Sequence, residues 1–182
     1  MNKLILIGFM GAGKSTVAAN LAVRLNIPAL EMDELIISRS GFGSIPEIFA
    51  AKGESFFRDL ESEVARTLAQ QSNLIISSGG GVIGRPENME QLKTNNGIVV
   101  FLRSTFATVI SRNGDLTTRP LFRDGKLALT LFNERAPTYA CWADITVDTD
   151  DRSIGEVCSE IVSGIESLAC HPSPSPRTPR SA

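Results

Sequence analysis

Short apolar runs alternate along the chain with longer segments in which apolar residues recur at helical spacing. Several runs, such as 4–7 and 98–103, are apolar at almost every position, which is typical of strands buried on both faces of a parallel sheet. The alternation predicts an α/β fold with three layers, α/β/α, around a parallel five-stranded sheet. The expected strands cover residues 4–7, 29–32, 73–78, 98–103 and 145–148.

Some of the helices between these strands have clear end signals. Ser44 and Glu47 have the spacing of a capping box, which predicts the start of a short helix, and Gly53 is expected to end it. The sequence has no internal repeat, and we expect a single domain over residues 1–170. The expected helices cover residues 13–25, 33–40, 44–53, 54–71, 86–94, 105–112, 126–135 and 153–168.

Two segments do not fit the alternation. Residues 113–125 are rich in turn-forming and charged residues, and an irregular loop of this length is uncommon in a compact domain unless it has a function. Residues 171–182 hold four of the nine prolines and no core-forming residue, so a disordered tail is expected. A ligand for a proline-binding domain is the alternative interpretation of this tail.

The composition narrows the function classes. The net charge of −2 argues against an overall basic surface for nucleic acid. Three cysteines without CxxC spacing indicate a reduced, cytoplasmic protein, and no apolar run is long enough to predict a membrane span. The single histidine, His171, lies in the tail, so catalysis by a histidine within the fold is excluded.

The first expected strand leads into a phosphate-binding P-loop, Gly8-x-x-x-x-Gly13-Lys14-Ser15, and a helix follows. Backbone N–H groups of such a loop, here including Gly11 and Ala12, point at phosphate oxygens. Lys14 is expected to reach the β- and γ-phosphates of a nucleotide, and the Ser15 hydroxyl to bind Mg²⁺. Thr16 is expected to add a contact to the α-phosphate.

Three classes of P-loop protein compete for this sequence. A GTPase switch would need the guanine-reading element N/T-K-x-D, which does not occur. A motor or multi-subunit ATPase usually has a strand with an acidic end, whereas the third expected strand ends in Ser77, Ser78 and three glycines. A small-molecule kinase needs a carboxylate near the acceptor hydroxyl, charged groups matched to the acceptor, and a lid that excludes water.

Candidates for the acceptor site occur in three places. Asp33 follows the second expected strand and could act as base or hold the acceptor hydroxyl, although a helix N-cap is the alternative. Arg58 and Arg135 together would suit a carboxylate, although a lone arginine on a helix is usually a solvated surface charge. Gly79 to Gly81 would let a substrate lie against bare backbone.

Six motifs in order give the sequence a family resemblance. From residue 3 to the closing helix, they resemble the shikimate kinases, and the ordered set is far more specific than the P-loop alone. The resemblance implies the P-loop NTPase fold and ATP-dependent phosphorylation of the 3-hydroxyl of shikimate. The motifs are GFMGAGKST, MDELI, FFRDLE, SGGGVI, RPLF and ERAPTYACWAD.

The resemblance also implies roles for individual residues. Asp33 is similar to the aspartate that binds the substrate hydroxyls, and Arg58 and Arg135 are similar to the pair that binds the shikimate carboxylate. Arg119 resembles an arginine of a mobile lid, expected near 113–125, that moves onto the phosphates. The implied roles of the remaining residues are substrate contact for Gly79, Gly80 and Gly81, and adenine contact for Arg112.

One position departs from the family pattern, and some alternatives stay open. Glu31 stands where the family usually has the first aspartate of D-x-D, which helps to hold the Mg²⁺ shell through water. The helices over 33–61 are expected to bind the substrate, and a monomer is expected. A gluconate-type kinase and a catalytically silent nucleotide-binding regulator are the alternative functions.

Overall fold

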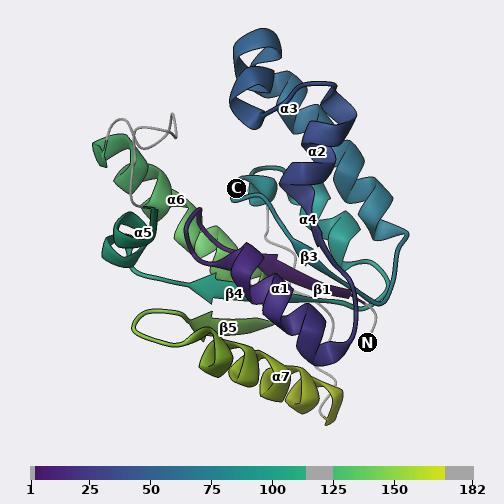
Figure 1. Cartoon of the computed structure of the whole chain (residues 1–182), viewed down its shortest axis with the longest axis vertical. Helices are drawn as coiled ribbons and strands as arrows, with labels where there is room; N and C mark the ends of the chain where they lie inside the picture. The colour runs from purple at the N-terminus through teal and green to yellow at the C-terminus, as the bar shows by residue number, and fades with distance from the viewer. Residues whose placement is uncertain (1–2, 114–124, 171–182) are drawn as a thin grey trace.

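A five-stranded sheet organises the chain, whose computed structural model describes residues 3–113 and 125–170 (Figure 1). All neighbouring strands are parallel, in the order β2-β3-β1-β4-β5. The five-stranded parallel sheet predicted from the sequence is therefore confirmed. The strands are β1 (Lys3–Ile7), β2 (Ala29–Glu31), β3 (Leu74–Ser77), β4 (Gly97–Arg103) and β5 (Ile145–Asp148).

Helices cover both faces of this sheet (Figure 1). Two helices, α1 and α7, pack on one face, and α2, α3, α4 and α6 pack on the other. The helices are α1 (Lys14–Leu25), α2 (Met32–Ser40), α3 (Ile45–Ala69), α4 (Pro86–Lys93), α5 (Phe106–Asn113), α6 (Gly125–Trp142) and α7 (Ile154–Cys170), with a short 3-10 turn, η1 (Val82–Gly84), before α4.

The central strand, β1, shows why the strand segments of the sequence are apolar at almost every position. Along β1, Leu4 and Leu6 point into the core beneath α1 and α7, whereas Ile5 and Ile7 point into the core beneath α3, α4 and α6. All four side chains are fully buried. Because successive side chains alternate between the two faces, a strand covered on both sides needs apolar residues at every position.

The helix pair α2 and α3 projects away from the sheet, toward the top of the view (Figure 1). The predicted N-cap is present, since the Ser44 hydroxyl accepts a hydrogen bond from the Glu47 backbone N–H at 3.4 Å, whereas the Glu47 carboxylate accepts from the backbone N–H of Gly43, one residue before the cap. The predicted break at Gly53 is also present, since its φ of 78° and ψ of 177° interrupt α3. This conformation is almost restricted to glycine. Gly53 therefore divides α3 into a first part before residue 53 and a second part that carries Arg58.

The end of α6 differs from the sequence prediction. The expected helix stopped at Arg135, but α6 continues through Pro137 to Trp142. An internal proline removes a backbone hydrogen bond and costs about 3 kcal/mol in an isolated helix. Burial of Tyr139 and Trp142 against the sheet offsets this cost, which local sequence signals do not report.

Several sequence predictions fall outside the described residues. Residues 114–124 contain Arg119 and nearly all of the expected lid, whose two end residues belong to α5 and α6. The expected tail, 171–182, is also outside the described residues. Within the described ranges, no helix is long and apolar enough to cross a membrane.

Candidate active site

The P-loop joins the central strand β1 to α1, and its backbone explains its glycines. Gly8 has a φ of 147°, and a Cβ there would lie 2.7 Å from the carbonyl oxygen of Leu102 on β4. Gly13 has a φ of 91° and caps the N-terminus of α1. Side chains are therefore disfavoured at both positions, and the loop can turn tightly in front of the helix.

Lys14 is the first residue of α1, and its side chain contacts the backbone of the P-loop. Its ammonium group donates to the carbonyl oxygens of Gly8, at 2.9 Å, and Phe9, at 3.0 Å. Only 9% of the residue is exposed. The positive charge is thereby held at the concave side of the loop, beside the N-terminus of α1, where both would attract phosphate oxygens.

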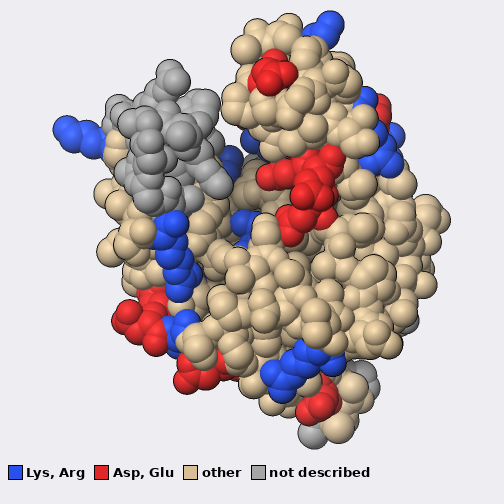
Figure 2. Space-filling view, viewed as in Figure 1, with Lys and Arg blue, Asp and Glu red and all other residues tan. Residues whose placement is uncertain are grey.

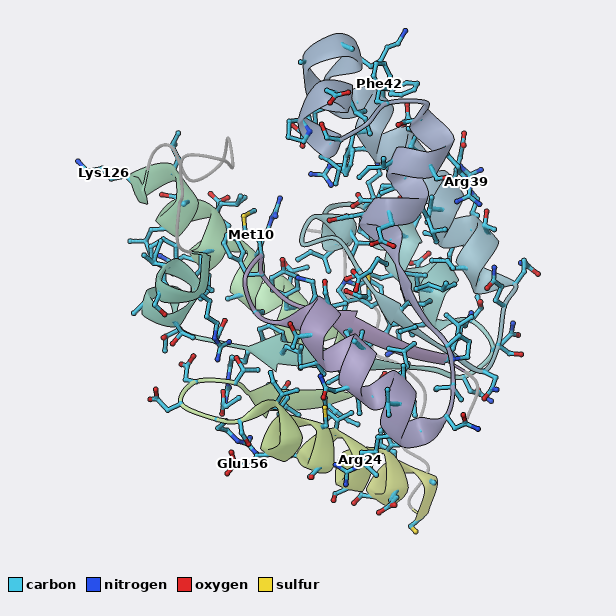
Figure 3. All side chains as sticks on the ribbon, in the orientation of Figure 1. Met10, Arg24, Arg39, Phe42, Lys126 and Glu156 are labelled. Atoms are coloured by element: carbon cyan, nitrogen blue, oxygen red, sulfur yellow. The ribbon has the colours of Figure 1, made fainter. Side chains whose placement is uncertain are left out.

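A cavity of about 540 Å³ opens in front of the P-loop. Figure 2 shows a hollow on this face with basic side chains inside it, and in Figure 3 Met10 lies on the P-loop beside that hollow. The cavity brings together most of the nucleotide and metal residues predicted from the sequence. The nucleotide and metal residues lining it are Gly11, Ala12, Gly13, Lys14, Ser15, Thr16, Glu31 and Arg112, and two predicted acceptor residues, Asp33 and Gly80, line it as well.

Two residues that the sequence did not single out also line this cavity. Thr149 and Arg152 follow β5 and also line the cavity. The Arg112 guanidinium donates to the Thr149 hydroxyl at 2.9 Å and also to the Thr149 carbonyl. Arg112 is thus held by Thr149 at the wall of this cavity, where its flat guanidinium could cover a planar base.

Asp33 lies on the first turn of α2 and faces the glycine loop that follows β3. A Cβ on Gly79 would lie 2.9 Å from Asp33 Oδ1. The alternative role of Asp33 as helix N-cap is wrong, because Glu31 occupies the N-cap position of α2. The carboxylate of Asp33 is therefore placed at the carboxyl edge of the sheet, beside the P-loop cavity that it lines.

Arg58 reaches the same glycine loop from α3. Its guanidinium bonds to Glu61 through Nη1 at 2.9 Å and to Glu54 through Nη2 at 3.2 Å, and it lies 5.1 Å from the centre of the Phe57 ring. Its side chain is only 18% exposed, so the alternative of a solvated surface charge is wrong. Burial alone would lower the pKa of Arg58, but the two carboxylates, Glu61 first, outweigh it and raise that pKa.

Glu61 is a site residue that the sequence reasoning missed. It is fully buried, and its Oε1 accepts no hydrogen bond from the described residues. Burial raises the pKa of the Glu61 carboxyl, while the charge and hydrogen bond of Arg58 act in the opposite direction. The available signal was its spacing, since residues three apart on a helix are neighbours and Glu61 follows Arg58 by three.

Arg135 approaches the glycine loop from α6. Its Nη1 donates to the carbonyl oxygen of Gly80 at 3.1 Å, and the hydroxyl of Tyr139 donates to the same oxygen. Arg58 and Arg135 therefore both reach the glycine loop, which Asp33 also faces, and both are held there by contacts with the protein itself. Tyr139 is a second residue that the sequence reasoning did not assign to the site.

A P-loop on a parallel sheet, an acidic residue beside it and two converging arginines define a P-loop phosphotransferase for small molecules. The profile of the shikimate kinase family matches residues 10–166. The chain belongs to the shikimate kinase family, and it is a phosphotransferase.

Relatives and solved structures agree with this membership. A shikimate kinase of Dehalococcoides mccartyi is 42% identical over 163 residues, which is 88% of this chain and 91% of that protein. A shikimate kinase of Lactococcus lactis is 44% identical over 160 residues, 87% and 94% of the two chains. The structure of the Acinetobacter baumannii shikimate kinase in complex with shikimate has a TM-score of 0.85 and 32% identity, covering 92% of this chain and 94% of that one.

One structural likeness bears on the alternative function. A gluconokinase from Sinorhizobium meliloti has a TM-score of 0.58 and 17% identity, covering 92% of this chain and 93% of that one. At this identity the likeness concerns the fold alone. The gluconate alternative is accordingly not favoured by the comparisons.

Proposed function

We propose that this site transfers the γ-phosphoryl group of ATP to the 3-hydroxyl of shikimate, giving shikimate 3-phosphate and ADP. One observation carries the proposal: Arg58 and Arg135 converge on the glycine loop next to Asp33, which itself lines the P-loop cavity. An acceptor bound by its carboxylate at the arginines would thus present a hydroxyl toward the P-loop, where the donor phosphate lies.

The acceptor carboxylate is proposed to take the place of Glu54 on Arg58. The Glu54 side chain is 68% exposed, and its Oε1 accepts from both Nε and Nη2, the guanidinium edge suited to a bidentate carboxylate. Glu61 would keep Nη1 while this exchange occurs. Arg135 would supply the second cation, and Asp33 would hold the acceptor hydroxyl or accept its proton.

ATP is proposed to bind with its phosphates along the P-loop, from Gly11 to Thr16. Lys14 would exchange its two carbonyl contacts for the β- and γ-phosphates. Arg112, held by Thr149, would lie against adenine. Arg119, outside the described residues, stays a sequence prediction: it would reach the phosphates in the transition state and spread the developing charge.

Mg²⁺ fits the donors present. Among the described residues, no group of three His, Cys, Asp or Glu side chains could hold a metal ion. Mg²⁺ needs no such cage, because it usually keeps several waters and binds one or two carboxylates plus substrate phosphates. Ser15 and Glu31 line the cavity and would hold it, Glu31 through water. When bound, Mg²⁺ would neutralise phosphate charge.

The reaction can be tested by measuring ADP release with ATP and Mg²⁺, with shikimate, gluconate or no acceptor. Turnover with shikimate alone is expected. Turnover with gluconate alone would show that the acceptor residues are misassigned, and no turnover with either would favour another acceptor or the silent regulator. An Arg58→Ala variant should raise the KM for shikimate and leave ATP binding nearly unchanged.

We further propose that the enzyme acts in the cytoplasm as a monomer. Residues 1–170 would form one catalytic domain, in which residues 33–61 are the acceptor-binding helices and residues 113–125 are the lid. Light scattering after gel filtration should give a mass near the 19.6 kDa of one chain. A chain ending at residue 170 should keep full activity, because the sequence of the tail has no core-forming residue. A dimer mass or an inactive truncated chain would contradict these proposals.

A further inference from the structure

Two donors share one acceptor at the centre of the glycine loop. The carbonyl oxygen of Gly80 accepts from Arg135 Nη1 at 3.1 Å and from the hydroxyl of Tyr139. Gly80 also packs against the P-loop, since a Cβ there would lie 3.4 Å from the backbone nitrogen of Met10. The carbonyl therefore lies where the acceptor and nucleotide halves of the site meet.

The surroundings of Tyr139 keep its hydroxyl protonated and directed at the Gly80 carbonyl. The residue is 1% exposed, and its ring stacks on Phe101 with the ring centres 5.3 Å apart. Burial raises the pKa of the Tyr139 hydroxyl to about 12, although the charge and hydrogen bond of Arg135 oppose the shift. The hydroxyl thus keeps its proton at neutral pH, and the packed ring keeps it aimed at Gly80.

The guanidinium of Arg135 would serve as donor to two groups, the Gly80 carbonyl and the carboxylate of the acceptor. In the structure its Nη1 is engaged by Gly80. A carboxylate bound side-on takes two parallel N–H groups on one edge of the guanidinium, and turning that edge toward the acceptor would move Nη1 away from the carbonyl. If no other donor were present, release would leave this part-buried carbonyl without a hydrogen bond from the protein, which is unfavourable.

We propose that Tyr139 is a positioning residue that keeps the Gly80 carbonyl hydrogen-bonded, so that Arg135 can turn to the carboxylate of the acceptor. This inference rests on the proposed function. It assigns Tyr139 no contact with shikimate or ATP. Its effect passes through Arg135, which makes the two residues energetically coupled.

The decisive variant is Tyr139→Phe, which keeps the ring and its stacking on Phe101 and removes only the hydroxyl. With Arg135 retained by the carbonyl, the KM for shikimate should rise about tenfold, the size expected for one lost hydrogen bond to a charged system. The KM for ATP should change less than twofold. A rise in both constants together with a lower melting temperature would show a merely structural role and would overturn the proposal.

A double-mutant cycle separates coupling from independent effects. Dissociation constants for shikimate are measured by calorimetry for the wild type, Tyr139→Phe, Arg135→Ala and the double variant. In the Arg135→Ala background, Tyr139→Phe should change the constant less than twofold. An equal, roughly tenfold effect in both backgrounds would mean that Tyr139 acts without Arg135.

The same series distinguishes the two levels of inference. If the wild type fails to release ADP with shikimate, the proposed function is wrong. If the wild type is active and Tyr139→Phe has a normal KM for shikimate, only the role of Tyr139 is wrong. A Phe101→Leu variant serves as control, because it removes the stacking partner of Tyr139 but keeps the hydroxyl. It should lower the melting temperature and change the KM for shikimate little.

Discussion

The guanidinium of Arg58 lies directly against the backbone of Gly81. A Cβ on residue 81 would be 2.3 Å from Nη1 and 2.7 Å from Nη2 of Arg58. Gly81 has a φ of −98°, which any residue can adopt. The glycine is therefore explained by the space that Arg58 occupies, and not by backbone conformation.

A Gly81→Ala substitution should displace Arg58 without unfolding the chain, because the obstructing group is the far end of a flexible side chain. We expect the KM for shikimate to rise about ten- to a hundredfold, the equivalent of one lost charged interaction, with ATP affinity unchanged. Steady-state kinetics with each substrate varied will check this. Gly84→Ala is the matched control, since a Cβ there would meet no described atom within 4 Å; equal effects of the two variants would contradict the explanation.

Lys14→Met should abolish turnover, with kcat lower by about 10²–10³ or more, because it removes the charge that faces the transferred phosphate. The variant should still bind shikimate, which calorimetry can measure. Lys52, exposed on α3, provides the control variant Lys52→Met, which should behave as the wild type. Normal turnover of Lys14→Met would refute the P-loop assignment.

Glu31→Ala should weaken the binding of Mg²⁺. We expect the Mg²⁺ concentration for half-maximal activity to rise about tenfold, as for loss of an outer-shell partner of a metal, while the KM for shikimate stays the same. Titrations of Mg²⁺ at saturating ATP and shikimate give the comparison. Glu34→Ala, on the exposed side of α2, is the control. Identical Mg²⁺ curves for wild type and Glu31→Ala would remove Glu31 from the metal site.

Glu61→Gln should change how stability depends on pH. Burial raises the pKa of Glu61 in the folded state above its ordinary 4.5, so the unfolded chain loses its proton first as the pH rises. The free energy of unfolding of the wild type, relative to the Gln variant, should therefore be highest below pH 4.5 and fall until the pH passes the raised pKa. Urea unfolding of both proteins from pH 4 to 8 measures this difference. A relative stability that increases with pH would mean that Arg58 outweighs burial.

Arg119→Ala should depress kcat far more than it changes the affinity for shikimate. The prediction comes from the sequence alone, since Arg119 is outside the described residues. An arginine that neutralises charge only in the transition state contributes to kcat and little to ground-state binding. Comparison of kcat with the dissociation constant for shikimate tests the split, and an unchanged kcat would exclude Arg119 from the mechanism.

Local patterns in the sequence were sufficient for much of the fold. The strand over 145–148 was predicted with the same ends as β5, whose residues Ile-Thr-Val-Asp alternate between apolar and polar types as expected for a strand. Gly53 was predicted to break the helical pattern, and it does. The end of α6 was misjudged because the packing of Tyr139 and Trp142 against the sheet outweighs the local cost of Pro137.

By itself the sequence determined the parallel sheet, the P-loop and the family, because each depends on residue types at fixed spacing along a continuous segment. Only the tertiary structure decided how Arg58, Glu61, Arg135 and Tyr139 divide the contacts around the glycine loop. These residues come from α3 and α6, and the burial and hydrogen bonding that define their roles arise only where those helices meet the carboxyl end of the sheet.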